Sequence, residues 1–355
     1  MGCSPINPCP HFPVCGGCIS QDVPHDAYVA GKRAIVVQAL GRAGVMAEVA
    51  PVIETPLHAR RRAVFKIKSL PEGLHVGFHA AKSHTIVDMH QCEILTPGLF
   101  ALVGRLRAKL EPIFGVGETA ELHVTECDNG FDAAFRWSRK LQPALVTLLS
   151  QALGDTGIIR LTMGNETVFE TTAPLVTLGP AQVKPPPHAF LQPTHAGEVT
   201  LRQHVLALTA KTKTVLDLFS GLGTFTLPLA AQAKVHAVET EAAMLDALAT
   251  AARNARGLKP LTTEARDLFK RPLTPLELNI YDAVVLDPPR AGAEAQAKAL
   301  AASKARRVAY VSCDAATFAR DAAILVKGGF VPGAVTPVDQ FLFSSHIELV
   351  AGFTR

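Results

Sequence analysis

The chain has 355 residues, of which 48% are hydrophobic and 19% charged, with a formal net charge of +4. This length allows two globular domains, and the slightly basic balance is compatible with a nucleic-acid partner. No apolar run is long enough to span a membrane, and the first residues lack the basic and apolar regions of a signal peptide. We therefore expect a cytoplasmic protein without a membrane partner, whose cysteines serve as ligands or catalysts rather than disulfides.

The first notable feature in chain order is a cysteine cluster. Cys9, Cys15 and Cys18 form the pattern C-x5-C-x2-C, and Cys92 follows much later in "MHQCEIL". Four thiolates with three of them clustered suit an iron–sulfur cluster or a tetrahedral metal. Zinc is the alternative, although structural zinc sites more often consist of two C-x2-C pairs. Two cysteines lack an evident partner and are expected to be structural: Cys3 and Cys127.

Strand and hairpin signals dominate the next part of the chain. "RRAVFKIK" and "LHVGFH" flank a Pro-Glu-Gly turn, and "AELHVTEC" and "FDAAFRWS" flank Asn129-Gly130, a strong hairpin signal. The run Arg60, Arg61, Arg62 at the first of these strands is either a contact for RNA phosphates or a solvated charge run. The prolines at 185–187 mark a break, so we expect a β-rich α+β domain over 1–188 and a second domain over 189–355.

After the prolines the pattern changes to alternating strands and helices. "TVLDLFSG", "KVHAVE", "YDAVVLDPP" and "RRVAYVSC" read as buried strands, and each precedes a helical stretch. Such alternation is typical of a doubly wound, Rossmann-like α/β domain with a parallel sheet.

The segment "VLDLFSGLGTF" has the features of a cofactor loop. Gly221 and Gly223 lie in a turn between a strand and a helix, and Glu239 ends the next strand, where an acidic residue can bind ribose hydroxyls. The single G-x-G argues against a dinucleotide and is compatible with S-adenosylmethionine, which has a ribose but no phosphate. The alternative is an accidental glycine turn.

Two further strand ends carry reactive residue types. "LDPPR" places Asp287 in a stiff proline loop of the kind that amino methyltransferases also use. "VAYVSCDAATFARD" places Cys313 between a strand and a helix, with Asp314 as the expected N-cap. Position alone leaves Cys313 either a small buried residue or a nucleophile whose thiolate the helix dipole favours.

Taken together, these motifs resemble those of the uracil-5 RNA methyltransferases, which form 5-methyluridine in ribosomal and transfer RNA. The similarity spans nearly the whole chain, and "CPHFPVCGGC" with "QCEIL" looks like the ligand set of the ribosomal branch. It implies a [4Fe–4S] cluster on the four cysteines Cys9, Cys15, Cys18 and Cys92. Matches in "FLQP", "DLFSG", "AVET" and "DPPRAG" imply that the cofactor-binding residues are Gln192, Phe219, Glu239 and Asp287.

The same resemblance implies a mechanism and a substrate. Cys313 would add to C6 of a uridine, and Glu348 in "HIEL" would remove the proton from C5 after methyl transfer. The cysteine set favours 23S ribosomal RNA as the substrate, with the transfer RNA T-loop as the alternative. A non-catalytic RNA-binding iron–sulfur protein and an amino methyltransferase are the rival classes. No obligate protein partner is inferred.

Overall fold

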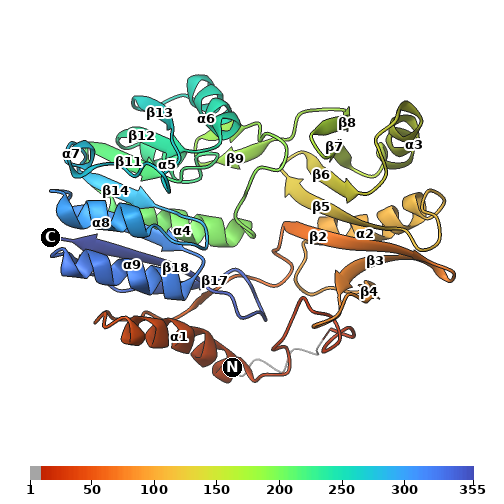
Figure 1. Cartoon of the computed structure of the whole chain (residues 1–355), viewed down its shortest axis with the longest axis horizontal. Coiled ribbons are helices and arrows are strands. Elements are labelled where there is room, and N and C mark those ends of the chain that lie inside the picture. Colours follow the sequence, from red (N-terminus) through yellow and green to blue (C-terminus); the bar gives the residue numbers. More distant parts are fainter. Residues whose placement is uncertain (1–8) are drawn as a thin grey trace.

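A computed structural model describes residues 9–355. Cys3 therefore lies outside the described part, and so do the first residues, on which the expectation of no signal peptide partly rests. The described chain forms two lobes, each around a sheet of its own (Figure 1). The helices are α1 (His25–Arg42), α2 (Pro97–Leu110), α3 (Pro143–Leu153), α4 (His195–Leu208), α5 (Thr226–Ala230), α6 (Ala242–Asn254), α7 (Pro275–Leu278), α8 (Glu294–Ala302) and α9 (Ala315–Lys327).

The first lobe contains seven strands: β2 (Arg62–Leu70), β3 (Gly73–His79), β4 (Ile86–Asp88), β5 (Thr119–Cys127), β6 (Gly130–Trp137), β7 (Ile158–Met163) and β8 (Glu166–Glu170). They pair in the order β4-β3-β2-β5-β6-β7-β8. Alternate side chains of β2, such as Phe65 and Ile67, are buried in one core with α2 and α3. The β2–β3 and β5–β6 hairpins expected from the sequence are confirmed by their antiparallel registers.

The second lobe contains nine strands: β1 (Ile53–Glu54), β11 (Thr214–Leu218), β12 (Lys234–Glu239), β13 (Leu261–Ala265), β14 (Ala283–Leu286), β15 (Arg307–Ser312), β16 (Val331–Pro332), β17 (Thr336–Asp339) and β18 (Glu348–Thr354). Their order is β1-β17-β18-β15-β14-β11-β12-β13, with β16 beside β18. Strands β11 to β15 pair in parallel, whereas β18 inserts antiparallel between β15 and β17. A separate ribbon joins β9 (Val176–Leu178) to β10 (Ala181–Val183).

Helices cover both faces of the nine-stranded sheet. On one face, α1, α8 and α9 contribute Leu40, Leu300 and Phe318 to a core with β11, β14 and β15. On the other face, α4 and α5 contribute Leu201 and Leu229. Because successive side chains of a strand point to opposite faces, strands buried on both sides must be continuously apolar, as "AVVL" in β14 is. The expected doubly wound α/β architecture is therefore confirmed.

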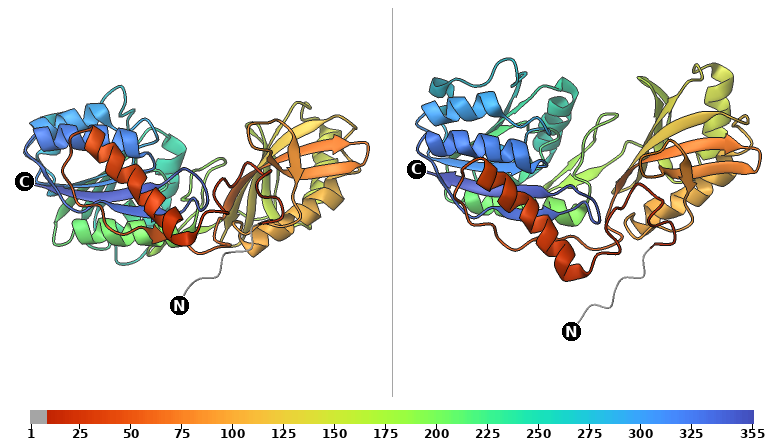
Figure 2. Two further views of the ribbon diagram at one scale, coloured as in Figure 1. Left: turned by 90° about the horizontal axis from the view of Figure 1, so that it is seen from below. Right: turned by 60° about the horizontal axis from the view of Figure 1, so that its bottom comes forward.

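Residues near the start of the chain pack on the second lobe. Figure 2 shows α1, in red, lying along the C-terminal lobe, and β1 extends that sheet by pairing in parallel with β17. The proline triplet at 185–187 lies between β10 and α4, where the expected domain boundary falls. The boundary itself stays a prediction. Among the described residues, no helix is long and apolar enough to cross a membrane.

Candidate active site

A cavity of about 770 Å³ opens at the carboxyl ends of the parallel strands. In an open α/β sheet this edge is where ligands bind, because the loops that follow the strands converge there. The expected site residues that line the cavity are Gln192, Phe219, Gly221, Glu239, Asp287, Cys313 and Glu348. Thr224, Arg290 and His346 lie in the same wall.

The loop after β11 forms the cofactor end of the cavity. Phe219 and Gly221 both have positive φ angles, 62° and 53°, and such a conformation turns the backbone sharply. Glu239 supports the turn, because its Oε2 accepts a hydrogen bond of 3.0 Å from the Gly221 amide. Gly223 is not in the cavity wall, and a Cβ there would approach Leu248 Cδ1 to 2.4 Å. The close approach of α6 explains why a glycine stands there, and a cofactor contact by Gly223 stays a prediction.

Cys313 lies between β15 and α9, as the sequence predicts. Asp314 caps the helix, since its Oδ1 accepts hydrogen bonds from the amides of Ala316 and Thr317 at 3.0 and 2.9 Å. Other influences on the thiol outweigh any help from the start of the helix. Burial, followed by the charges of Glu348 and Asp287, raises the pKa of Cys313 to about 11, and Arg290 only partly opposes them.

A buried network of side chains joins the two carboxyl groups of the cavity. Gln340 donates from Nε2 to Glu348 Oε2 at 3.0 Å and to Gln192 Oε1 at 2.8 Å. Gln192 in turn donates to Asp287 Oδ2 at 3.4 Å. The sequence analysis missed Gln340, because no motif marks "VDQF" and its partner Gln192 is 148 positions away in the chain.

Burial sets the protonation of both carboxyl groups. It raises the pKa of Glu348 to about 7, against the opposing effect of the hydrogen bond from Gln340. The pKa of Asp287 is also raised well above its usual range, first by burial and then by the charges of Glu348 and Asp217. A carboxyl group with a pKa near neutrality can both accept and release a proton under working conditions, which is the property of a general base.

The three arginines of the sequence run have different positions. Arg60 and Arg62 line the cavity, and the Arg62 guanidinium lies 4.7 Å from the centre of the Phe190 ring. Arg61 points elsewhere and is buried, with Nη2 2.6 Å from Glu198 Oε2 and Nε 3.0 Å from the Gln192 carbonyl. A paired and buried guanidinium is not free to meet phosphate. The expectation of an RNA contact by Arg61 is therefore corrected: this residue, just before β2, connects the start of that strand to α4.

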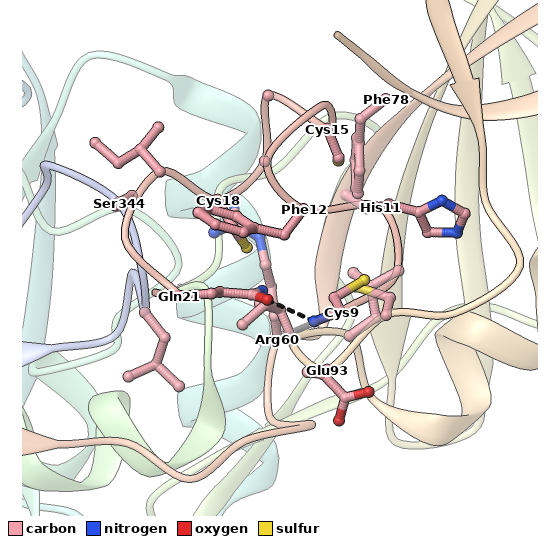
Figure 3. Close-up of a pocket in the computed structure, with 18 of the residues that line it drawn as sticks. Cys9, His11, Phe12, Cys15, Cys18, Gln21, Arg60, Phe78, Glu93 and Ser344 are labelled. Carbon is pink, nitrogen blue, oxygen red and sulfur yellow. Dashed lines mark hydrogen bonds between the residues drawn. The ribbon is translucent and has the colours of Figure 1, made fainter. Parts of the chain in front are cut away.

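The four cluster cysteines Cys9, Cys15, Cys18 and Cys92 line a second cavity, of about 490 Å³. Figure 3 shows the first three of them around it, with the Cys9 amide donating to Gln21 Oε1 at 2.8 Å. All four are free thiols. Burial raises the pKa of Cys18 to about 12, and the neighbouring cysteines add to the effect.

The donor set of this second cavity suits a soft metal or an iron–sulfur cluster, because four thiols face one space. Within residues 9–355, however, no three Cys, His, Asp or Glu side chains lie close enough together to hold a metal ion. The two cavities share part of their walls, including Arg60, Arg290 and His346.

The fold and the first cavity are of the kind that the sequence motifs predict for an S-adenosylmethionine-dependent methyltransferase, and comparison with known proteins shows the family. The model of the tRNA (uracil-5-)-methyltransferase family matches residues 180–353. An uncharacterized RNA methyltransferase of Brucella suis is 43% identical over 98% of this chain and 84% of its own length. The 23S rRNA (uracil(1939)-C(5))-methyltransferase RlmD of Bordetella avium is 34% identical over 97% of this chain and 77% of its own length.

A solved structure is similar in fold. The tRNA (uracil-54, C5)-methyltransferase of Pyrococcus abyssi, in complex with S-adenosyl-L-homocysteine, superposes with a TM-score of 0.75 at 21% identity, over 96% of this chain and 86% of that chain. From the sequence relatives, the chain belongs to the RNA uracil-5 methyltransferase family. RNA is accordingly its substrate class and S-adenosylmethionine its methyl donor, as the resemblance of the motifs implies.

Proposed function

We propose that this protein methylates C5 of a uridine in large-subunit ribosomal RNA through a covalent adduct with Cys313. The observation that carries the proposal is the placement of Cys313 and Glu348 in the wall of one cavity together with the loop of Gly221. The relative that acts on 23S rRNA and the four cysteines support the ribosomal substrate. The alternative substrate is transfer RNA, which the name of the matching family suggests.

Each residue has a defined task in this reaction. The Cys313 thiol releases its proton to solvent, its sulfur bonds to C6 of uracil, and the ring electrons move toward C5. When bound, S-adenosylmethionine supplies an electrophilic methyl group. Glu348 then takes the proton from C5, the C5–C6 double bond re-forms, and the C6–S bond breaks to release the thiolate. Gln192, Phe219, Glu239 and Asp287 hold the cofactor and orient the reacting groups.

Glu348→Gln tests the covalent mechanism. The amide keeps the size of the side chain but cannot take a proton at neutral pH, so methyl transfer should occur and elimination should stall. RNA isolated from a strain lacking this gene serves as the substrate, with methyl-labelled S-adenosylmethionine. We expect a labelled protein–RNA species on a denaturing gel that disappears when Cys313→Ala is added. Normal turnover of the variant would show that a residue other than Glu348 is the base. Mapping 5-methyluridine in the products shows whether ribosomal or transfer RNA is the substrate.

We further propose that the chain divides into domains over 1–188 and 189–355. The first domain carries a [4Fe–4S] cluster on Cys9, Cys15, Cys18 and Cys92. The support is that these four thiols face one cavity. Anaerobically purified protein should contain iron and sulfide, and Cys15→Ala should lose both, whereas Cys127→Ala should keep them. Stoichiometric zinc without sulfide would refute the cluster.

Arg60 and Arg62 are the proposed phosphate contacts, because both face the cavity that a flipped uridine must enter. Changing both to Ala should weaken RNA binding and flatten its dependence on salt, since fewer counterions are released. The exposed Arg253 and Arg256, changed together to Ala, give the matched loss of two charges and should leave the slope as it is. An unchanged slope in the double variant would remove these two arginines from the RNA interface.

A further inference from the structure

Gln340 follows directly after β17 and is 1% exposed, yet the proposed chemistry gives it no task. Both hydrogens of its amide are used, one on Glu348 and one on Gln192. It does not belong to the wall of the cavity, whereas Gln192, Asp287 and Glu348 do. Gln340 therefore touches the residues around the substrate rather than the substrate.

The orientation of this amide is determined by its surroundings. Gln340 Oε1 is buried and has no hydrogen-bond partner in the described part of the chain. It faces the first turn of α4, where a Cβ on Gly197 would lie only 2.4 Å away. The positive end of a helix dipole favours an oxygen there, and a carboxylate favours the NH₂ group on the other side. A flipped amide would place two oxygens against each other.

The hydrogen bonds of Gln340 leave one oxygen of Glu348 free. Only Oε2 has a hydrogen-bond partner in residues 9–355, so Oε1 is the oxygen available to a substrate in the cavity. From Glu348 the chain of hydrogen bonds runs through Gln340 and Gln192 to Asp287. Glu348 and Asp287 are thus joined through the two glutamines in one hydrogen-bonded network.

We propose that Gln340 is a positioning residue for the elimination step: its amide fixes one oxygen of Glu348, so that the other is directed at the C5 proton. The proposal rests on the proposed function, in which Glu348 is the base. Truncating Gln340 should therefore slow elimination much more than methyl transfer, because only elimination depends on the direction and ionisation of Glu348.

The same hydrogen bond affects the charge of the base. Burial raises the pKa of Glu348, and the bond from Gln340 opposes this rise. The other ionisable groups near this base are Asp287, Asp217, Cys313 and His346, with Arg290 as the nearby cation. Removing the donor raises the pKa of Glu348, so a smaller fraction is ionised at neutral pH. The pH profile of elimination should then move to higher pH.

Gln340→Met, which keeps the shape and removes the donor, tests the proposal. The decay of the labelled protein–RNA adduct is followed after rapid mixing at several pH values, with the same RNA as substrate. We expect decay to be roughly tenfold slower at neutral pH, the effect of one hydrogen bond to a charged group, with recovery at higher pH. Gln340→Glu should shift the profile further, because it places a second carboxyl group beside Glu348.

Gln296→Met provides the matched control. Gln296 is equally buried but bonds only to the backbone of Leu273, away from the cavity, so its loss should lower stability without moving the pH profile. Gly197→Ala offers an independent route, since the added methyl group displaces Gln340, and it should reproduce part of the shift. A wild-type pH profile in Gln340→Met would overturn the positioning role. Absence of an adduct in Glu348→Gln would instead overturn the proposed function.

Discussion

Glu348 is the residue at which burial and chemistry are most directly coupled. Its usual pKa of 4.5 rises to about 7 in the folded protein. Between these two values the folded state binds more protons than the unfolded state, so the free energy of unfolding falls as pH rises. The contribution of neutral Glu348 to the free energy of unfolding is complete below about pH 4.5 and is lost as pH rises through 7. The base therefore costs stability in the pH range in which it acts.

This coupling predicts a pH-dependent stability difference for Glu348→Gln. At pH 4 the variant should unfold like the wild type, because Glu348 is then largely neutral in both the folded and the unfolded state. At pH 8 the variant should be more stable by roughly 1–3 kcal/mol, because it buries no charge. Chemical denaturation at both pH values measures this difference. Glu264→Gln, on the partly exposed rim of β13, is the control and should show no such gain. Equal stability of Glu348→Gln and wild type at pH 8 would contradict the raised pKa.

At the scale of elements, the junction of β15 and α9 places Cys313. The strand is continuously buried from Val308 to Ser312, and Asp314 begins the helix by capping two of its free amides. Strand β18 runs antiparallel beside β15, with Ser312 opposite Leu349. Because of this register, Cys313 and Glu348 come from neighbouring strand ends. The Asp314 cap then determines the position of Cys313.

Removing the cap should therefore change both stability and reactivity. Asp314→Ala is expected to lower the free energy of unfolding by about 1 kcal/mol. Fraying of the first turn should also speed the alkylation of Cys313 by iodoacetamide, since the thiol becomes less buried. Thr96→Ala removes the corresponding cap of α2 in the other lobe and should cost similar stability with no change in alkylation. Identical alkylation rates for the two variants would mean that the cap does not control the cysteine.

At the scale of the whole molecule, a buried ion pair joins the two ends of the chain. Lys32 of α1 lies 2.9 Å from Asp339 Oδ1, and the two residues are 307 positions apart. The Lys32 ammonium also donates to the carbonyls of Phe341 and His346, in the loop that leads to Glu348. Tyr28 donates to the same carboxylate. The first helix of the chain therefore anchors the segment that presents the base.

Lys32→Met should destabilise the protein by about 3–5 kcal/mol, because it leaves the buried charge of Asp339 without its cation. Adding Asp339→Asn should restore part of this loss, so the double variant should lose less than the sum of the single changes. Lys298→Met is the control, since its pair with Glu294 is exposed and contributes at most about 1 kcal/mol. Urea unfolding is measured for the wild type, Lys32→Met, Asp339→Asn, the double variant and Lys298→Met. Additive losses would show that Lys32 and Asp339 do not interact energetically.

Much of the fold could be predicted from local patterns. Alternating apolar residues and an Asn-Gly turn predict the β5–β6 hairpin, and a continuous apolar run predicts a strand such as β14, because both patterns depend on neighbours in the chain. The expected cofactor loop and Cys313 come together in one cavity, since the carboxyl ends of parallel strands share an edge. Glu348 joins them because β18 runs antiparallel to β15 and begins at that edge.

By itself, then, the sequence determined the elements, the family motifs and the edge of the sheet where they meet. Only the tertiary structure decided which side chains are buried together. The burial of Arg61 against Glu198 and the bonds of Gln340 join distant parts of the chain, and no periodic pattern encodes them. The raised pKa of Cys313 likewise depends on carboxyl groups from other strands. Electrostatic and hydrogen-bond energies depend on distances in space, and these become fixed only when the lobes have folded.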